Sequence, residues 1–169
     1  MPCKAGYRQS LEESKRRAVE EREALRSDPF RKLWVSLVAR ENGSPNGFDS
    51  LTEPERLYYS VGLLELEVYN GGFDQYFFNS SSSYYAHAEA GLALLGAAQA
   101  LQLLRQAKEE LFPAAAVPED TKARRQALRV PRSPELDSKL SGLDRQYWAD
   151  PDGLEPRLQA FAREHGLVP

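Results

Sequence analysis

The two histidines, His87 and His165, are the first residues to test for catalysis. His87 lies four residues after Ser83, so both can face one side of a helix, and a Ser–His pair could support nucleophilic hydrolysis. No G-x-S-x-G turn surrounds Ser83, and a carboxylate that orients His87 would have to come from elsewhere in the chain. We therefore expect that the chain is not an enzyme and keep an uncharacterised hydrolase as an alternative.

Metal and phosphate sites have their own spacings, and the chain matches none of them. It has no H-E-x-x-H or Cys–His pattern, and neither histidine has a glutamate three residues before it, as a di-iron bundle requires. Gly71-Gly72 is not followed by the GK[ST] of a phosphate-binding loop. We expect no metal, no cofactor and no catalytic residues.

One short segment, Asn70–Asn79, combines aromatic, glycine and polar side chains. We expect a mainly structural role, in which the aromatics attach the segment to the core and the polar groups satisfy backbone groups at helix ends. The alternative is an aromatic and amide surface, the composition of interaction hot spots. We call this segment the box, and its residues with an expected role are Asn70, Gly71, Gly72, Phe73, Asp74, Gln75, Tyr76, Phe77 and Asn79.

The net charge of −3 is distributed unevenly. Residues 1–47 carry ten Lys or Arg against seven Asp or Glu, whereas residues 48–112 carry three against nine. An acidic middle disfavours direct contact with nucleic-acid phosphates and suits a basic protein partner, although a plain solvated surface is the simpler interpretation. The candidate binding residues are seven of the nine acids of this region: Asp49, Glu53, Glu55, Glu65, Glu67, Asp74 and Glu89.

The elements that must position these residues are all predicted to be helical. We expect an all-α, compact bundle of about seven to eight helices, forming a single domain with a charged helical N-terminal extension. The turn-rich segment 42–47 predicts a boundary between an extension, residues 1–47, and the main helical domain, residues 48–169. Asp28-Pro29, Ser133-Pro134 and Asp152–Glu155 are typical helix starts.

The helix that leads into the box has the clearest pattern. Thr52–Glu55 forms a capping box, and Asn70-Gly71-Gly72 ends the helix because asparagine and glycine tolerate left-handed backbone. Its apolar residues cover more than half of its circumference, so it should be central to the core. At least one of Glu65 and Glu67 then lies against buried surface and needs a partner.

The expected cellular compartment follows from three features that the sequence does not show: a disulfide pair, a signal peptide and a membrane span. The single cysteine, Cys3, cannot form an internal disulfide, and a charged stretch follows residues 1–8 where a signal peptide needs an apolar core. The most apolar run, residues 84–104, contains polar side chains that make a membrane span unfavourable. We expect a cytoplasmic protein that does not enter the membrane.

From Thr52 to Pro113 the chain resembles a bacterial family of unknown function that includes a DNA-mimic protein. The resemblance rests on an acidic capped helix, then N-G-G-F-D-Q-Y-F-x-N-S, then an Ala/Leu helix ending in L-F-P, and it extends over about residues 48–165. It implies an all-helical fold and allows a homodimer. In the family's DNA mimic, carboxylates replace phosphates on the DNA-binding face of a transcription factor, whereas the charge of this chain is weak for that role.

These observations favour a non-enzymatic protein-interaction module. Its more specific form would be a DNA mimic that sequesters a basic, DNA-binding surface of another protein. The expected partner is another protein, with no direct nucleic acid. An immunity or antitoxin-like inhibitor of a specific effector is a further alternative, which predicts a single tight partner.

Overall fold

Eight α-helices and two short 3₁₀ turns account for most of residues 4–129 and 131–169, the part of the chain that the computed structural model describes, and this part contains no strand. The prediction of a single all-α domain is confirmed, while Cys3 lies outside the described residues. In chain order the elements are α1 (Lys4–Ser27), α2 (Pro29–Gly43), η1 (Gly47–Ser50), α3 (Glu53–Phe78), η2 (Ser80–Tyr84), α4 (Tyr85–Leu94), α5 (Ala98–Leu111), α6 (Thr121–Ala127), α7 (Pro134–Trp148) and α8 (Leu154–Glu164).

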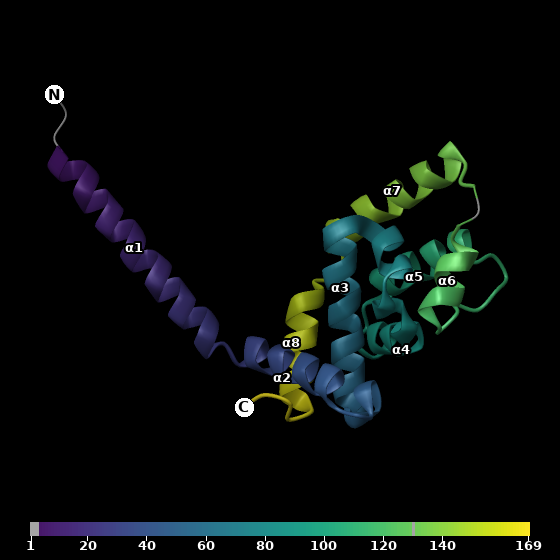
Figure 1. Ribbon diagram of the computed structural model, residues 1–169, viewed down its shortest axis with the longest axis horizontal. Helices are drawn as coiled ribbons and strands as arrows, with labels where there is room; N and C mark the ends of the chain where they lie inside the picture. Colours follow the sequence, from purple (N-terminus) through teal and green to yellow (C-terminus); the bar gives the residue numbers. More distant parts are fainter. Residues whose placement is uncertain (1–3, 130) are drawn as a thin grey trace.

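Helix α3 is the centre of the fold, as its broad apolar surface predicts. It contacts α2, α4, α6, α7 and α8, which surround it in Figure 1. Val61, Leu64 and Val68 on α3 have no solvent exposure. Burial of such side chains is the main favourable contribution to folding, so the position of α3 follows from its composition.

Helix α1 extends away from this body (Figure 1). Most of its residues are charged or polar, and its main contact is with α2, the next helix in the chain. By contrast, α2 belongs to the packed body, because Leu33 and Leu37 are buried in the core and Trp34 packs on Tyr59 with 5.2 Å between the ring centroids.

Most helix starts are capped as their sequences predict. Asp28 accepts a hydrogen bond from the Phe30 N–H at 3.0 Å, and Ser133 accepts one from the Leu136 N–H at 3.2 Å. Asp152 is an exception, because its carboxylate accepts from the N–H of Ala100 at 2.7 Å and so caps α5 instead of its own helix.

Candidate functional site

The box begins at a sharp change of direction within α3. Gly71 and Gly72 leave the helical conformation, and Gly72 has a φ of +74° that favours glycine. The segment that follows is capped from α7, since the Phe73 N–H donates to Asp144 Oδ1 at 2.8 Å. Burial raises the pKa of Asp144, although the hydrogen bond from Phe73 opposes this shift. A side chain at residue 72 would collide with this cap, because its Cβ would lie 2.4 Å from Asp144 Oδ2.

The aromatic residues of the box pack mainly into the core. Phe73, Tyr76 and Phe77 have no solvent exposure. Phe73 meets Tyr147 edge to face, with 5.4 Å between the ring centroids. Phe78 is the exposed aromatic of the segment, and these burials leave little of the box as aromatic surface.

Glu67 holds the polar side chains of the box together. Its carboxylate accepts hydrogen bonds from Gln75 Nε2 at 2.7 Å, Asn79 Nδ2 at 2.9 Å and Ser81 Oγ at 2.8 Å. One carboxylate on the first part of α3 thereby fixes the second part and η2. Charged acceptors make stronger hydrogen bonds than neutral ones, so this cluster stabilises the turn after the box.

Arg124, a residue that the sequence did not single out, completes the structure around the box. Its side chain on α6 is fully buried and donates to the carbonyl oxygens of Phe77 at 2.9 Å, Asn79 at 2.6 Å and Pro118 at 2.6 Å. No carboxylate of the described residues forms an ion pair with it, and burial lowers its pKa. In the charged run that contains Arg124, nothing distinguishes it from Arg125.

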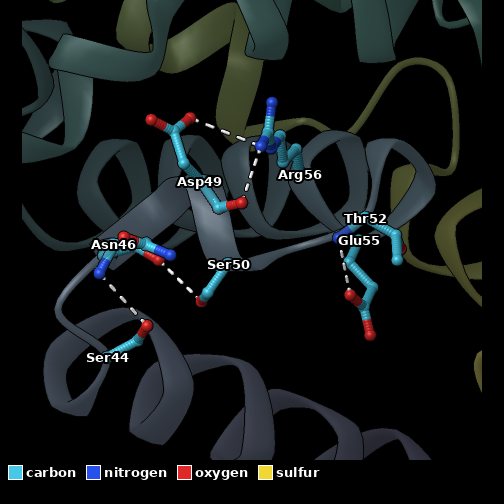
Figure 2. A network of polar contacts seen from close by, with 8 residues as sticks. Ser44, Asn46, Asp49, Ser50, Thr52, Glu55 and Arg56 are labelled. Atoms are coloured by element: carbon cyan, nitrogen blue, oxygen red, sulfur yellow. Dashed lines mark hydrogen bonds and ion pairs between the residues drawn. The ribbon is translucent and has the colours of Figure 1, made fainter.

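The acidic candidates near the start of α3 are held by arginines. Asp49 Oδ1 lies 3.3 Å from Arg56 Nη2, which also donates to the Asp49 carbonyl at 2.9 Å (Figure 2). Glu55 pairs with Arg40 and accepts from the Thr52 N–H at 2.8 Å. Partial burial raises the pKa of Glu55, but these hydrogen bonds outweigh it, so its pKa lies below the ordinary value.

Two further acidic candidates are paired with arginine side chains. Asp74 lies 2.6 Å from Arg132, and Glu89 lies 2.6 Å from Arg105. Because Glu67 has an internal role, Glu53 and Glu65 are the two remaining candidates, and neither forms an ion pair with a described residue. Glu53 is exposed in the first turn of α3.

Glu65 lies in a groove between α2, α3 and α8. The groove has a volume of about 490 Å³. Its walls are largely aromatic and aliphatic, and its carboxylates come from Glu65 and Glu155. The lining residues are Phe30, Arg31, Trp34, Tyr58, Gly62, Glu65, Leu66, Tyr69, Asn70, Glu155, Leu158 and Gln159. A cleft of this size and composition is typical of a binding site.

The carboxylate of Glu65 has an unusual environment. Burial raises its pKa to about 7, and the nearby negative charges of Asp150 and Glu155 contribute to the shift. None of the lysines or arginines in the described part of the chain forms an ion pair with Glu65. At least one of Glu65 and Glu67 was expected to need a partner: Glu67 has hydrogen-bond partners, whereas Glu65 has no ion pair with a cation of the described residues.

Exposed apolar side chains lie at the end of α3, in the groove and on the neighbouring helix α7. Leu66 is 51% exposed and Tyr69 is 47% exposed, and both line the groove. Trp148 on α7 is 45% exposed and donates from Nε1 to the Val68 carbonyl at 2.8 Å. Exposed apolar patches mark protein-interaction surfaces, and tyrosine and tryptophan are the aromatic residues enriched at their hot spots.

Ser83 and His87, the residues of the hydrolase alternative, make separate contacts. Ser83 Oγ donates to the Glu119 carbonyl at 2.6 Å, whereas the His87 ring packs edge-on against Phe48 with 5.0 Å between centroids. His165 packs against Phe161 at the end of α8. The expectation that the chain is not an enzyme stays a prediction.

The fold and groove define an all-helical protein with an acidic, apolar cleft. A family model described as DMP19-like protein matches residues 49–165, so the chain belongs to the DMP19-like family, and the expected DNA-mimic-protein-like family is confirmed. No curated protein and no solved structure matches the chain. Over the described residues, no helix has both the length and the apolar content that a membrane crossing requires.

Proposed function

We propose that this chain is a non-enzymatic protein-interaction module that acts as a DNA mimic, by occupying the basic, DNA-binding surface of a partner protein. Its membership of the DMP19-like family is the observation that carries the proposal. A DNA-binding surface is rich in lysine and arginine, so carboxylates of the chain can take the place of phosphates there. The site of action is then the cytoplasm, where such partners are found.

The electrostatics of the chain restrict where this contact can form. Asp49, Glu55, Asp74 and Glu89 are each compensated by an arginine of the same chain. Glu65, Glu155 and Asp150 have no such ion pair among the described residues, which makes the groove and its rim the strongest candidate surface. An arginine of the partner can supply the missing charge without first displacing an internal pair.

The test is capture of a partner on the tagged full chain, followed by competition with DNA. The captured protein is purified and bound to a fluorescent DNA duplex, and the chain is then added while anisotropy is measured. We expect the duplex to be released at stoichiometric amounts of the chain, with weaker competition at high salt. A partner that does not bind DNA, or a ternary complex that retains the duplex, contradicts the proposal; a single toxic effector as partner would support the immunity alternative.

A further inference from the structure

The groove between α2, α3 and α8 carries a more specific inference about what the partner presents. We infer that it binds a helix of the partner protein on which one arginine or lysine lies among apolar residues, with Glu65 as the counter-ion. This inference rests on the proposed function only in taking another protein as the ligand. It does not require that the partner bind DNA.

One side of the groove is apolar. The indole of Trp34 lies directly on Gly62, since a Cβ at residue 62 would be 2.6 Å from Trp34 Cζ3. Tyr58 and Leu66 line the groove from the same helix, α3, as Gly62. Large aromatic faces beside an aliphatic side chain bind apolar residues of a ligand, and the electron-rich face of tryptophan also attracts a cation.

The carboxylates at the groove favour a ligand with a positive charge. Glu65 and Glu155 line it, Asp150 is close enough to raise the pKa of Glu65, and Glu65 has no ion pair among the described residues. Arg31 lines the groove from α2, but among the described residues it forms no ion pair with Glu65. A guanidinium or ammonium group that enters beside Glu65 gains a charge-assisted hydrogen bond in a partly desolvated site.

The extent of the apolar surface favours a helix over a small cation. The groove has a volume of about 490 Å³ and is lined at the end of α3 by the exposed side chains of Leu66 and Tyr69. The ring of Tyr69 also meets Tyr147 of α7, the neighbour in the chain of the exposed Trp148. An amphipathic helix places side chains at i, i+3, i+4 and i+7 on one face, so it can fill such a groove and cover its edge together. Nucleic acid is unsuitable here because its phosphates would meet Glu65 and Glu155.

Two synthetic peptides of about 16 residues, long enough for an isolated helix to form in part, test the inference on the full chain. Both consist of Ala, Leu and Gln with one apolar stripe, and they differ at one position in that stripe, which is arginine in one peptide and its neutral analogue citrulline in the other. Isothermal titration calorimetry gives each Kd. The indole N–H signals of the two tryptophans report the location by NMR.

We expect the arginine peptide to bind about tenfold more tightly than the citrulline peptide and to shift the Trp34 signal. Glu65→Gln should reduce this preference to about twofold or less, whereas Asp49→Asn, an equal charge change at a distant exposed position, should retain it. Leu66→Ala should weaken both peptides to a similar degree. Glu65→Gln is nearly isosteric, and circular dichroism checks that each variant is folded.

Several results would overturn the inference: no binding of either peptide, equal binding of both to the wild type, a preference retained in Glu65→Gln, or full affinity in Leu66→Ala. The inference would also be wrong if a second copy of the chain filled the groove. The wild type would then be a dimer in sedimentation velocity, and the peptide would not bind to the groove. The DNA-mimic proposal can fail while this inference holds. In that case the chain would bind the arginine peptide as expected but release no DNA from the captured partner.

Discussion

Glu65 and Glu67 lie two residues apart on one helix, and their surroundings give them different roles. A separation of two residues directs side chains to different faces of a helix. Glu67 faces the box and receives three hydrogen bonds, whereas Glu65 faces the groove and has no ion pair within the part of the chain that the structure describes. Residue type alone could not have separated a structural carboxylate from one that is available to a ligand.

Replacing Glu65 should change how stability depends on pH. Its pKa is about 7 in the folded chain against an ordinary value of 4.5, so between these pH values the folded state binds more protons than the unfolded state. Stability from this group is therefore fully present below pH 4.5 and is lost as the pH rises through 7. Glu65→Gln should raise the free energy of unfolding at pH 8 by about 1–3 kcal/mol.

Urea unfolding at pH 4.5, 6 and 8 measures this effect, with Asp49→Asn as the control. The free energy of unfolding of Glu65→Gln should diverge from that of the wild type as the pH rises. The curve for Asp49→Asn should stay parallel to the wild-type curve. A Glu65→Gln variant that gains nothing at pH 8 would show that the carboxylate is well solvated in the folded chain.

Replacing Gly72 with alanine should destabilise the fold for two reasons. Its backbone has a φ of +74° and a ψ of −177°, a region that is nearly exclusive to glycine, and a Cβ would collide with the Asp144 cap. Gly72→Ala should cost about 2–4 kcal/mol in thermal or urea unfolding. Gly153→Ala is the matched control, because Gly153 also has positive φ but open space around it; it should cost only about 1–2 kcal/mol. Equal costs would mean that α7 moves away without penalty.

At the scale of the elements, local signals predicted helices well and long-range contacts poorly. The caps at Asp28 and Ser133 and the end of the straight helix at Gly71-Gly72 depend on neighbouring residues, so sequence spacing was sufficient. Asp144 and Asp152 instead cap segments that lie 71 and 52 residues away, and no local spacing encodes such a partner. This is why the Asp152 prediction was wrong about the helix that it caps.

Arg124 provides the clearest test of such a long-range contact. Arg124→Lys keeps the charge but cannot reach the carbonyls of Phe77, Asn79 and Pro118 together, so buried acceptors lose their donors. We expect a loss of about 2–4 kcal/mol in urea unfolding. Hydrogen exchange should become faster in α6 and η2 before other helices. Lys122→Arg is the control at an exposed position of the same helix, and an equal loss there would contradict the role of Arg124.

At the scale of the whole molecule, charge totals located the acidic region but not the candidate surface. The count over residues 48–112 is correct, yet Arg40 and Arg132, which neutralise two of its acids, come from outside it. The groove likewise combines Trp34, Glu65 and Glu155 from three helices, of which α8 is distant in the chain from α2 and α3. The sequence supplied each wall of this groove as an apolar stripe, but only the packing of the helices brings the walls together.

The boundary expected at residue 47 leads to a prediction for two truncations. Removal of residues 1–27 takes away α1, which extends from the body in Figure 1, and leaves Asp28 to cap α2. The free energy of unfolding should change by less than about 1 kcal/mol, because a polar helix outside the core buries little apolar surface. Removal of residues 1–43 also takes away the buried Leu33 and Leu37, whose burial contributes about 1.5–3 kcal/mol each.

The second truncation also uncovers Tyr59 and removes Arg40, the partner of Glu55. Their combined loss is comparable with the total stability of a domain of this size, so cooperative unfolding in urea, followed by near-ultraviolet circular dichroism, should disappear. A stable, cooperative chain that begins at residue 44 would instead place the boundary at residue 47, as the sequence predicts. The two truncations together therefore determine whether α2 is part of the extension or of the domain.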